Sequence, residues 1–136
     1  MKIGLDYHGV IDKHPNLFRM ITNGFNINNA EVHIVTGSKK KDIEDFLQHH
    51  DIYYTHFFSI TDEFLKNKLP YTIDKRGNPS FQDSLWNSAK AMYCACNKID
   101  LMIDDSEIYG KYFVTPYVLF KTLDWAGGNS GDCVSL

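Results

Sequence analysis

The segment KIGLDYHGVID, residues 2–12, places a short apolar run directly before an acidic side chain, Asp6. An apolar run of this length is typical of a buried strand, so we expect a strand over residues 3–6 that ends on the acid. The segment IDLMIDD, residues 99–105, has the same arrangement and ends on two acids. Two buried strands that each end on acids predict a parallel sheet with these side chains at its carboxyl edge.

Strand and helix patterns alternate along the rest of the chain, which is typical of α/β proteins with a parallel sheet. Further strands are expected at residues 31–36, 56–60 and 117–120. Helices are expected at residues 14–23, from the turn after Gly37-Ser38, and up to Cys96. We therefore predict a Rossmann-like three-layer α/β sandwich around a central parallel sheet.

Apolar residues at helical spacing predict which sides of two helices face the core. In the first helix these residues are Leu17 and Ile21. In the last helix they are Leu85, Trp86, Ala89, Met92, Tyr93 and Cys96. Four further aromatic residues are interpreted as core: Phe57, Phe58, Tyr112 and Phe113.

Residues 61–80 show a less regular pattern, because Leu69-Pro70 and the stretch RGNP, residues 76–79, interrupt it. We interpret this region as a small insertion that is too short to be an independent domain. The whole chain, residues 1–136, is expected to form a single domain. The segment from about residue 126, which is rich in Gly, Asn and Ser, is expected to be a flexible tail.

The composition indicates a folded protein and gives no signal for nucleic acid as a partner. The chain has 136 residues, of which 43% are hydrophobic, so it can bury a substantial core. Its net charge of −3 does not call for nucleic acid as a partner. The only cationic run, Lys39-Lys40-Lys41, is interpreted as solvated surface.

The cysteines and the N-terminus favour a cytoplasmic location. Cys94 and Cys96 have the wrong spacing for a zinc knuckle, and with Cys133 the cysteines are odd in number, so we expect reduced thiols. Asp6 stands where a signal peptide needs apolar residues, and no stretch approaches the roughly 20 apolar residues of a membrane span. No membrane partner is expected.

The strand ends carry a set of side chains with a shared chemistry. Parallel strands would bring Asp6, Thr36 and the pair Asp104-Asp105 together beyond their carboxyl ends. Several carboxylates in one cleft repel each other, and a divalent cation relieves this; an all-oxygen site suits Mg²⁺. The hydroxyl of Thr36 and the backbone amides of Gly37 and Ser38 can hold phosphate oxygens, and a lysine would balance the remaining charge.

These segments together resemble the haloacid dehalogenase-like (HAD) phosphatase superfamily. The matching segments are DYHGVID at residues 6–12, VTGS at residues 35–38, Lys90, and IDDS at residues 103–106. They occur in the family's order, and the resemblance spans roughly residues 2–120. It implies a HAD-like fold with a minimal cap, and Mg²⁺-dependent hydrolysis of a phosphomonoester through an aspartyl phosphate on Asp6.

The resemblance also implies a role for each matching residue. Asp6 would be the nucleophile and a metal ligand, and Lys90 would balance the charge of the site. The phosphoryl group would be bound by Thr36, Gly37, Ser38 and Lys90. The metal would be held by Asp6, the backbone carbonyl of His8, Asp104 and Asp105.

His8 departs from the family pattern, which usually has a second Asp at this position. Histidine can transfer protons near neutral pH, so His8 can be the acid/base residue, or only its carbonyl can matter. The substitution leaves two alternatives open. One is a catalytically weak or silent phosphate- or nucleotide-binding module, and the other is a protein-interaction domain.

Several assignments have competitors within the sequence. Lys98 or Lys75 could replace Lys90 as the charge-balancing residue. Asp12 is interpreted as turn or surface, and His14, His49, His50 and His56 as structural or exposed, because no ligand partners stand at suitable spacing. The expected substrate is a phosphorylated small molecule, a nucleotide or the phosphorylated end of a polymer, and the oligomeric state stays open.

Overall fold

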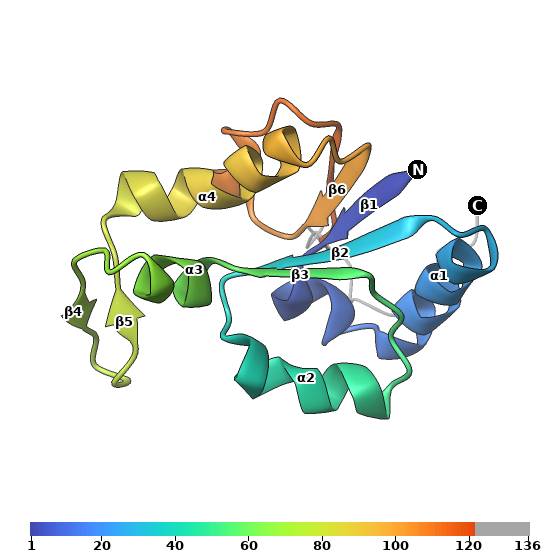
Figure 1. Cartoon of the computed structure of the whole chain (residues 1–136), viewed down its shortest axis with the longest axis horizontal. Helices are drawn as coiled ribbons and strands as arrows, with labels where there is room; N and C mark the ends of the chain where they lie inside the picture. Colours follow the sequence, from blue (N-terminus) through green and yellow to red (C-terminus); the bar gives the residue numbers. More distant parts are fainter. Residues whose placement is uncertain (122–136) are drawn as a thin grey trace, which may run out of the picture.

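A computed structural model describes residues 1–121 of the chain. Within these residues, a five-stranded sheet has the order β3-β2-β1-β6-β7, and each neighbouring pair is parallel (Figure 1). The strands are β1 Lys2–Leu5, β2 Glu31–Thr36, β3 His56–Ser59, β6 Leu101–Asp104 and β7 Tyr117–Leu119. The predicted α/β fold with a central parallel sheet is therefore confirmed. The expected tail and Cys133 lie outside the described residues.

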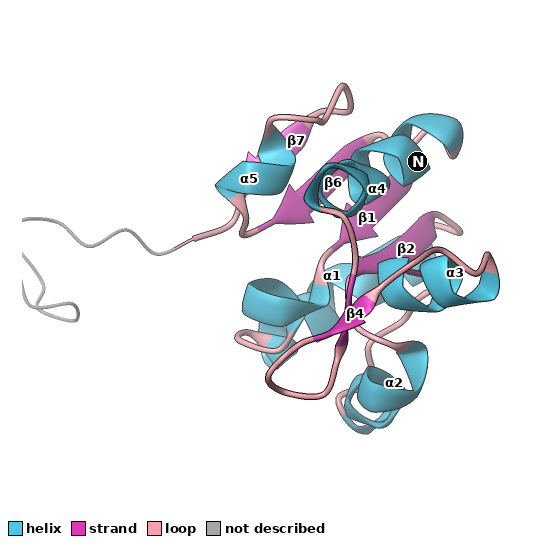
Figure 2. Ribbon diagram, turned by 90° about the vertical axis from the view of Figure 1, so that its left-hand side faces the viewer, coloured by secondary structure: helices cyan, strands magenta, loops and turns pink. Residues whose placement is uncertain are grey.

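Helices cover both faces of this sheet, with α4 on one side and α1 and α2 on the other (Figure 1), as the view from the side also shows (Figure 2). The helices are α1 Pro15–Ile27, α2 Lys40–His49, α3 Ile60–Lys66, α4 Asp83–Cys96 and α5 Glu107–Gly110. A short π-type turn, η1 Tyr7–Ile11, follows β1. The arrangement is that of a Rossmann-like sandwich.

The core has two parts because β2 buries both of its faces. Successive side chains of a strand point to opposite faces, and Ile34 and Val35 are both fully buried. Ile34 packs in one cluster with Phe18 of α1 and Leu47 of α2. Val35 packs in the other cluster with Cys94 of α4. Two helical layers thus hold the sheet from both sides.

The predicted core-facing side of α1 is only partly correct. Ile21 packs against the core, but Leu17 is 44% exposed, and the most buried residues are Phe18 and Thr22. Phe18, Ile21 and Phe25 repeat at the spacing of one helical stripe, and Leu17 lies beside that stripe. Because Phe25 continues it, the helix runs past the expected end at residue 23.

The predicted side of α4 is also only partly correct: Ala89 is buried and Tyr93 packs against a buried cluster. Leu85 and Met92 are 45% and 64% exposed, and Cys96 is exposed, whereas Lys90 and Cys94 are buried. Apolar residues occur on several sides of this helix, so their spacing does not select one side. The choice follows from the acidic side chains beneath the helix, which are described in the next subsection.

Residues 61–80 are more regular than expected. Ser59 caps α3 by accepting a hydrogen bond from the amide of Asp62, and acidic residues in the first turn favour a helix start. A small antiparallel hairpin follows, with β4 Thr72–Ile73 and β5 Pro79–Ser80. The Asp74 carboxylate closes its turn by accepting hydrogen bonds from the amides of Arg76 and Asn78.

The expectation that four aromatic residues belong to the core is only partly correct. Tyr112 is 43% exposed and so does not belong to the core, whereas Phe57, Phe58 and Phe113 pack against the buried clusters.

Among the helices of residues 1–121, none has both the length and the apolar character needed to cross a membrane.

Candidate active site

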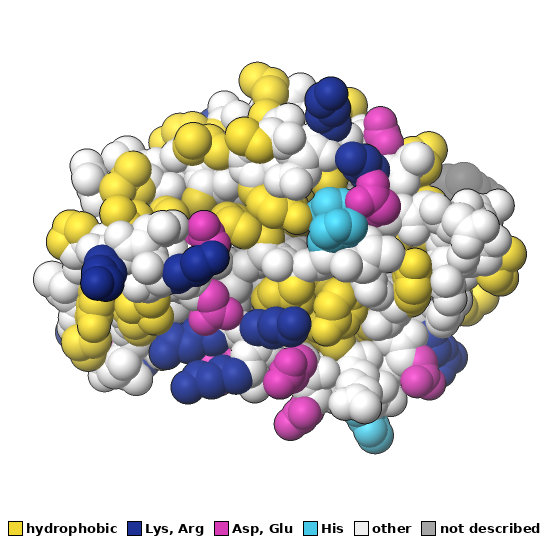
Figure 3. Space-filling model, viewed as in Figure 1, with side chains coloured by type: hydrophobic (Ala, Val, Ile, Leu, Met, Phe, Trp, Pro, Cys, Tyr) yellow, Lys and Arg dark blue, Asp and Glu magenta, His cyan; other side chains and the backbone are white. Residues whose placement is uncertain are grey.

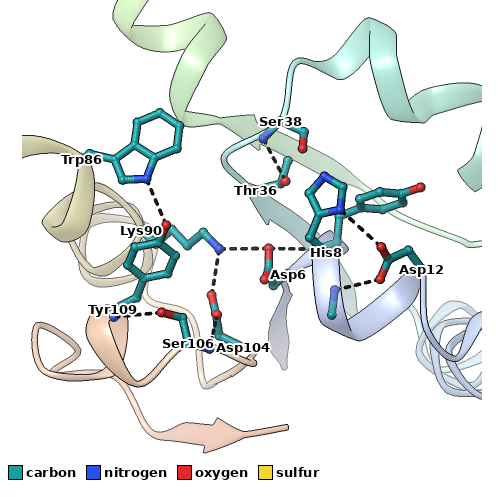
Figure 4. A network of polar contacts seen from close by, with 12 residues as sticks. Asp6, His8, Asp12, Thr36, Ser38, Trp86, Lys90, Asp104, Ser106 and Tyr109 are labelled. Atoms are coloured by element: carbon teal, nitrogen blue, oxygen red, sulfur yellow. Dashed lines mark hydrogen bonds and ion pairs between the residues drawn. The ribbon is translucent and has the colours of Figure 1, made fainter. Parts of the chain in front are cut away.

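The carboxyl ends of three neighbouring strands place acidic and hydroxyl side chains side by side. Asp6 follows β1, Thr36 ends β2, and Asp104 ends β6. Because β1 pairs with both β2 and β6, these three ends meet at one edge of the sheet. All three side chains are buried, and Asp105 follows directly and is partly buried. Figure 4 shows the resulting network.

Lys90 reaches this edge from α4. Its Nζ atom lies 2.9 Å from Oδ1 of Asp6 and 2.8 Å from Oδ2 of Asp104, and its side chain is 3% exposed (Figure 4). It also lies over the ring of Tyr109, 4.8 Å from the centroid. The alternatives Lys75 and Lys98 are exposed and do not line the cleft. Lys90 is therefore the lysine that the structure places among the acids.

The buried charges shift each other's pKa. Burial raises the pKa of Asp6 to about 7; Lys90 lowers this pKa, and Asp104 raises it. Burial acts to lower the pKa of Lys90, but Asp6 and then Asp104 outweigh it, so the pKa of Lys90 is raised. Lys90 therefore stays a cation, and one positive charge faces the carboxylates of Asp6, Asp104 and Asp105.

The acids fit a hard divalent cation. Asp6, Asp104 and Asp105 each offer a carboxylate oxygen, and these oxygens lie within 4.8 Å of one another. An all-oxygen donor set of this kind suits Mg²⁺. Three carboxylates face the single ammonium of Lys90, so added positive charge is favourable there. The residues present thus fit the expected metal.

Gly9 brings the turn after β1 against the metal-ligand candidates. Its φ of +79° is one that L side chains rarely adopt, and a Cβ atom added there would overlap the carboxylate of Asp105. His8 precedes it in an extended conformation. Only glycine therefore lets the backbone of this turn approach Asp105. In the sequence, the glycine of the His8-Gly9 pair is a signal for such a turn, but it does not show that Asp105 lies beside the turn.

The predicted phosphate-binding residues Thr36, Gly37 and Ser38 follow one another at the end of β2. Gly37 and Ser38 precede α2, which begins at Lys40, so they are not in its first turn. The amide of Ser38 donates a hydrogen bond of 3.1 Å to Oγ1 of Thr36 (Figure 4). Thr36 thus has its hydroxyl proton available for an acceptor in the cleft, and Thr61 donates to the carbonyl of Gly37.

His8 lies at the open side of this network. Its side chain is 68% exposed, and its Nδ1 atom lies 3.2 Å from Oδ2 of Asp12. The other oxygen of Asp12 accepts a hydrogen bond of 2.7 Å from the amide of Gly9. Asp12 therefore orients both the imidazole of His8 and the turn, a role that the sequence interpretation as plain turn or surface missed.

A cleft of about 690 Å³ opens over these residues. Its lining includes residues that the sequence analysis did not single out as functional: Asp74, Arg76, Asn78, Trp86 and Tyr109. The indole of Trp86 donates a hydrogen bond of 2.9 Å to the hydroxyl of Tyr109. The turn signal at Gly77 predicts a loop there, but only packing shows that this loop faces the acids.

Lys39 and Asp42 also line the cleft, so the interpretation of Lys39 as solvated surface is corrected, whereas Lys40 and Lys41 are exposed. Cys94 is buried and Cys96 is exposed, and both are free thiols. His14 and His49 are exposed.

Comparison of the chain with protein-family models, with curated proteins and with solved structures finds no match.

Proposed function

We propose that this protein is a Mg²⁺-dependent phosphohydrolase of the HAD-like type that cleaves a phosphomonoester through an aspartyl phosphate. The observation that carries the proposal is the buried contact of Lys90 with both Asp6 and Asp104, beside Asp105 and Thr36 at the carboxyl edge of the sheet. Three carboxylates, one lysine and one hydroxyl in a single cleft suit the binding and transfer of a phosphoryl group.

Asp6 is the nucleophile in this proposal. The amide of Tyr7 and the ammonium of Lys90 both contact its Oδ1 atom, at 2.8 and 2.9 Å. These contacts hold the carboxylate in place and favour its charged form, and they leave Oδ2 for attack on phosphorus. The bond from phosphorus to the alcohol oxygen of the substrate then breaks, and the phosphoryl group is carried on Asp6.

Thr36 and Lys90 stabilise the transferring group. The hydroxyl of Thr36 donates to a phosphoryl oxygen, and the amide of Gly37 provides a second donor. Asp6, Asp104, Asp105 and the carbonyl of His8 would hold Mg²⁺. When bound, the ion would supply positive charge to the phosphoryl oxygens. Throughout the reaction, the positive charge of Lys90 offsets the repulsion between the carboxylates of Asp6 and Asp104.

His8 and Asp12 provide proton transfer. With Nδ1–H donating to Asp12, the Nε2 atom of His8 can carry the second proton of an imidazolium. This proton passes to the departing alcohol oxygen. The neutral His8 then takes a proton from water as the water oxygen attacks phosphorus, which releases inorganic phosphate and restores the Asp6 carboxylate.

The hairpin β4–β5 acts as the minimal cap. It contributes Arg76 to the lining of the cleft, so a substrate would meet a guanidinium as well as the acids. The cleft volume of about 690 Å³ suits a phosphorylated small molecule or a nucleotide. A phosphorylated polymer end could also enter, since the cleft is open to solvent.

A phosphate-binding module without turnover is the second candidate. It is favoured by one observation, the 68% exposure of the His8 side chain, which places the proton carrier at the edge of the site. In that case the chain would bind phosphate or a nucleotide at Thr36 and Lys90 without cleaving it.

Release of phosphate from an aryl phosphate, with Mg²⁺ and with EDTA, tests the proposal. We expect Mg²⁺-dependent turnover in the wild type, none in Asp6→Asn, and slower turnover in His8→Ala. Trapping of beryllium fluoride on Asp6 gives a readout of the nucleophile that does not depend on rate. An inert wild type whose His8→Asp variant gains turnover would establish the binding module instead.

A further inference from the structure

A second group of ligand-type side chains lies at the opposite end of the sheet. Glu31 begins β2, His33 follows two residues later, and His56 begins β3. Residues two apart on a strand face the same side, and His33 pairs in register with His56. The three side chains therefore share one face at the amino ends of the strands, far along β2 from Thr36.

The structure corrects the interpretation of His56 as a residue without ligand partners. Its Nδ1 atom lies 3.5 Å from Oε1 of Glu31, and Nε2 of His33 lies 3.6 Å from the same oxygen. Glu31, His33 and His56 each offer one ligand atom, and these atoms lie within 4.8 Å of one another. Figure 3 shows histidine beside acidic and basic side chains on this face.

The Nε2 atom of His33 is the decisive feature. The His33 side chain is only 2% exposed, and within residues 1–121 its Nε2 atom is buried without a hydrogen-bond partner. The 3.6 Å to Glu31 is too long for a hydrogen bond. An unsatisfied buried polar atom is destabilising, so its retention calls for a partner.

Tyr93 of α4 sets the orientation of this ring. Its hydroxyl lies 2.7 Å from Nδ1 of His33. Histidines that bind metals commonly donate their other N–H group to an oxygen, which fixes the tautomer. With Nδ1–H donating to Tyr93, Nε2 keeps its lone pair, and the nearest ligand-type oxygen is Oε1 of Glu31, at 3.6 Å.

We propose that Glu31, His33 and His56 bind a divalent transition-metal ion, with Zn²⁺ as the best fit. Two imidazoles and one glutamate form a ligand set of zinc that leaves a fourth position for water. Imidazole ligands also give this site a different metal preference from that of the cleft, whose carboxylates suit Mg²⁺. The site does not depend on the proposed hydrolase activity.

The side chains need one adjustment to bind the ion. The rings of His33 and His56 stack at 4.2 Å with an interplanar angle of 6°, whereas a metal must lie in the plane of each ring. His56 is 48% exposed and can turn out of the stack, which also breaks the 2.8 Å hydrogen bond between its Nδ1 atom and Oγ1 of Thr55. His33 is held by burial. Lys2 pairs with Oε2 of Glu31 and leaves Oε1 for the ion.

The ion would join two strands. Because β3 is the edge strand of the sheet, a metal shared by His56 and β2 would hold this edge in place. A ligand that binds only the folded state raises its stability by mass action. Zn²⁺ should therefore raise the midpoint of thermal unfolding.

Titration of the full chain with Co²⁺, in excess Mg²⁺ to occupy the acidic cleft, tests the site through visible d–d absorption. We expect a saturable spectrum of nitrogen and oxygen ligation in the wild type that Zn²⁺ abolishes. His56→Ala and Glu31→Gln change exposed and partly exposed side chains, so they should fold, and each should weaken binding more than about tenfold. Tyr93→Phe should weaken it about tenfold.

Two controls distinguish this site from other histidines and from the cleft. His49→Ala removes an exposed histidine elsewhere, and Asp105→Asn removes an acid of the cleft. Both should bind Co²⁺ as the wild type does, and Zn²⁺ should still raise their unfolding midpoints. The proposal is wrong if His56→Ala and Glu31→Gln retain wild-type affinity, or if Asp105→Asn loses the spectrum.

Discussion

The ammonium nitrogen of Lys90 lies 2.9 Å from Oδ1 of Asp6, and both side chains are almost completely buried. The same nitrogen lies 2.8 Å from Asp104, whose side chain is fully buried. A single cation from α4 therefore compensates two carboxylates from different strands. Its removal would leave the acids buried without a counter-charge.

Lys90→Met tests this dependence through stability. We expect the free energy of unfolding to fall by about 3 kcal/mol or more in EDTA, because breaking a buried ion pair leaves an uncompensated charge. Urea denaturation measures the change. Lys41→Met on the exposed side of α2 is the matched control and should stay within about 0.5 kcal/mol of the wild type. Equal stability of Lys90→Met and the control would contradict the expectation.

Gly9→Ala should disrupt the acidic cleft, because its Cβ atom would overlap Asp105. Gly77 is a matched control, since its φ of +80° is nearly the same as that of Gly9 but no atom lies within 4 Å of an added Cβ. In Gly77→Ala, the free energy of unfolding should fall only by the backbone strain that alanine introduces, about 1 kcal/mol. Urea denaturation should show a larger loss of stability for Gly9→Ala than for Gly77→Ala. Mg²⁺ titration should show weaker binding for Gly9→Ala only.

Arg76→Ala should weaken substrate binding more than the chemical step. Arg76 lines the cleft from the hairpin, and a hydrogen bond to a charged group contributes about 1.5–3 kcal/mol, so KM should rise about tenfold or more with little change in kcat. Lys75→Ala, an exposed neighbour outside the cleft lining, should leave KM unchanged. Steady-state kinetics on one phosphomonoester would separate the two; an unchanged KM in Arg76→Ala removes this residue from the substrate site.

The two thiols at the end of α4 should react very differently. Burial raises the pKa of Cys94 to about 12, so the reactive thiolate is scarce up to pH 9. Cys96 is exposed. Iodoacetamide followed by peptide mass mapping should label Cys96 and spare Cys94 in the folded protein, and label both in urea. Rapid labelling of Cys94 at pH 8 under native conditions would show that this part of α4 opens.

Local patterns were sufficient for the strands of the parallel sheet, but not for the hairpin β4–β5 or the helix faces. Residues 31–36 were predicted as a strand and form β2 with the same bounds. In α1, by contrast, Leu17 is exposed and Phe18 is buried, because both residues fit a helical period and only the packing partner selects one. The capped helix α3 was missed because the prolines and glycine that follow it dominated the pattern.

The sequence alone determined that apolar strands end on Asp6, Thr36 and Asp104, and hence that a parallel α/β sheet would collect these side chains at one edge. Such patterns are local, since a strand's burial is visible in its own residues. Only the tertiary structure decided that Lys90, and not Lys75 or Lys98, joins the acids, and that His33 and His56 lie together beside Glu31. Those relationships depend on strand register and on how α4 packs across the sheet, and no spacing within the chain encodes them separately.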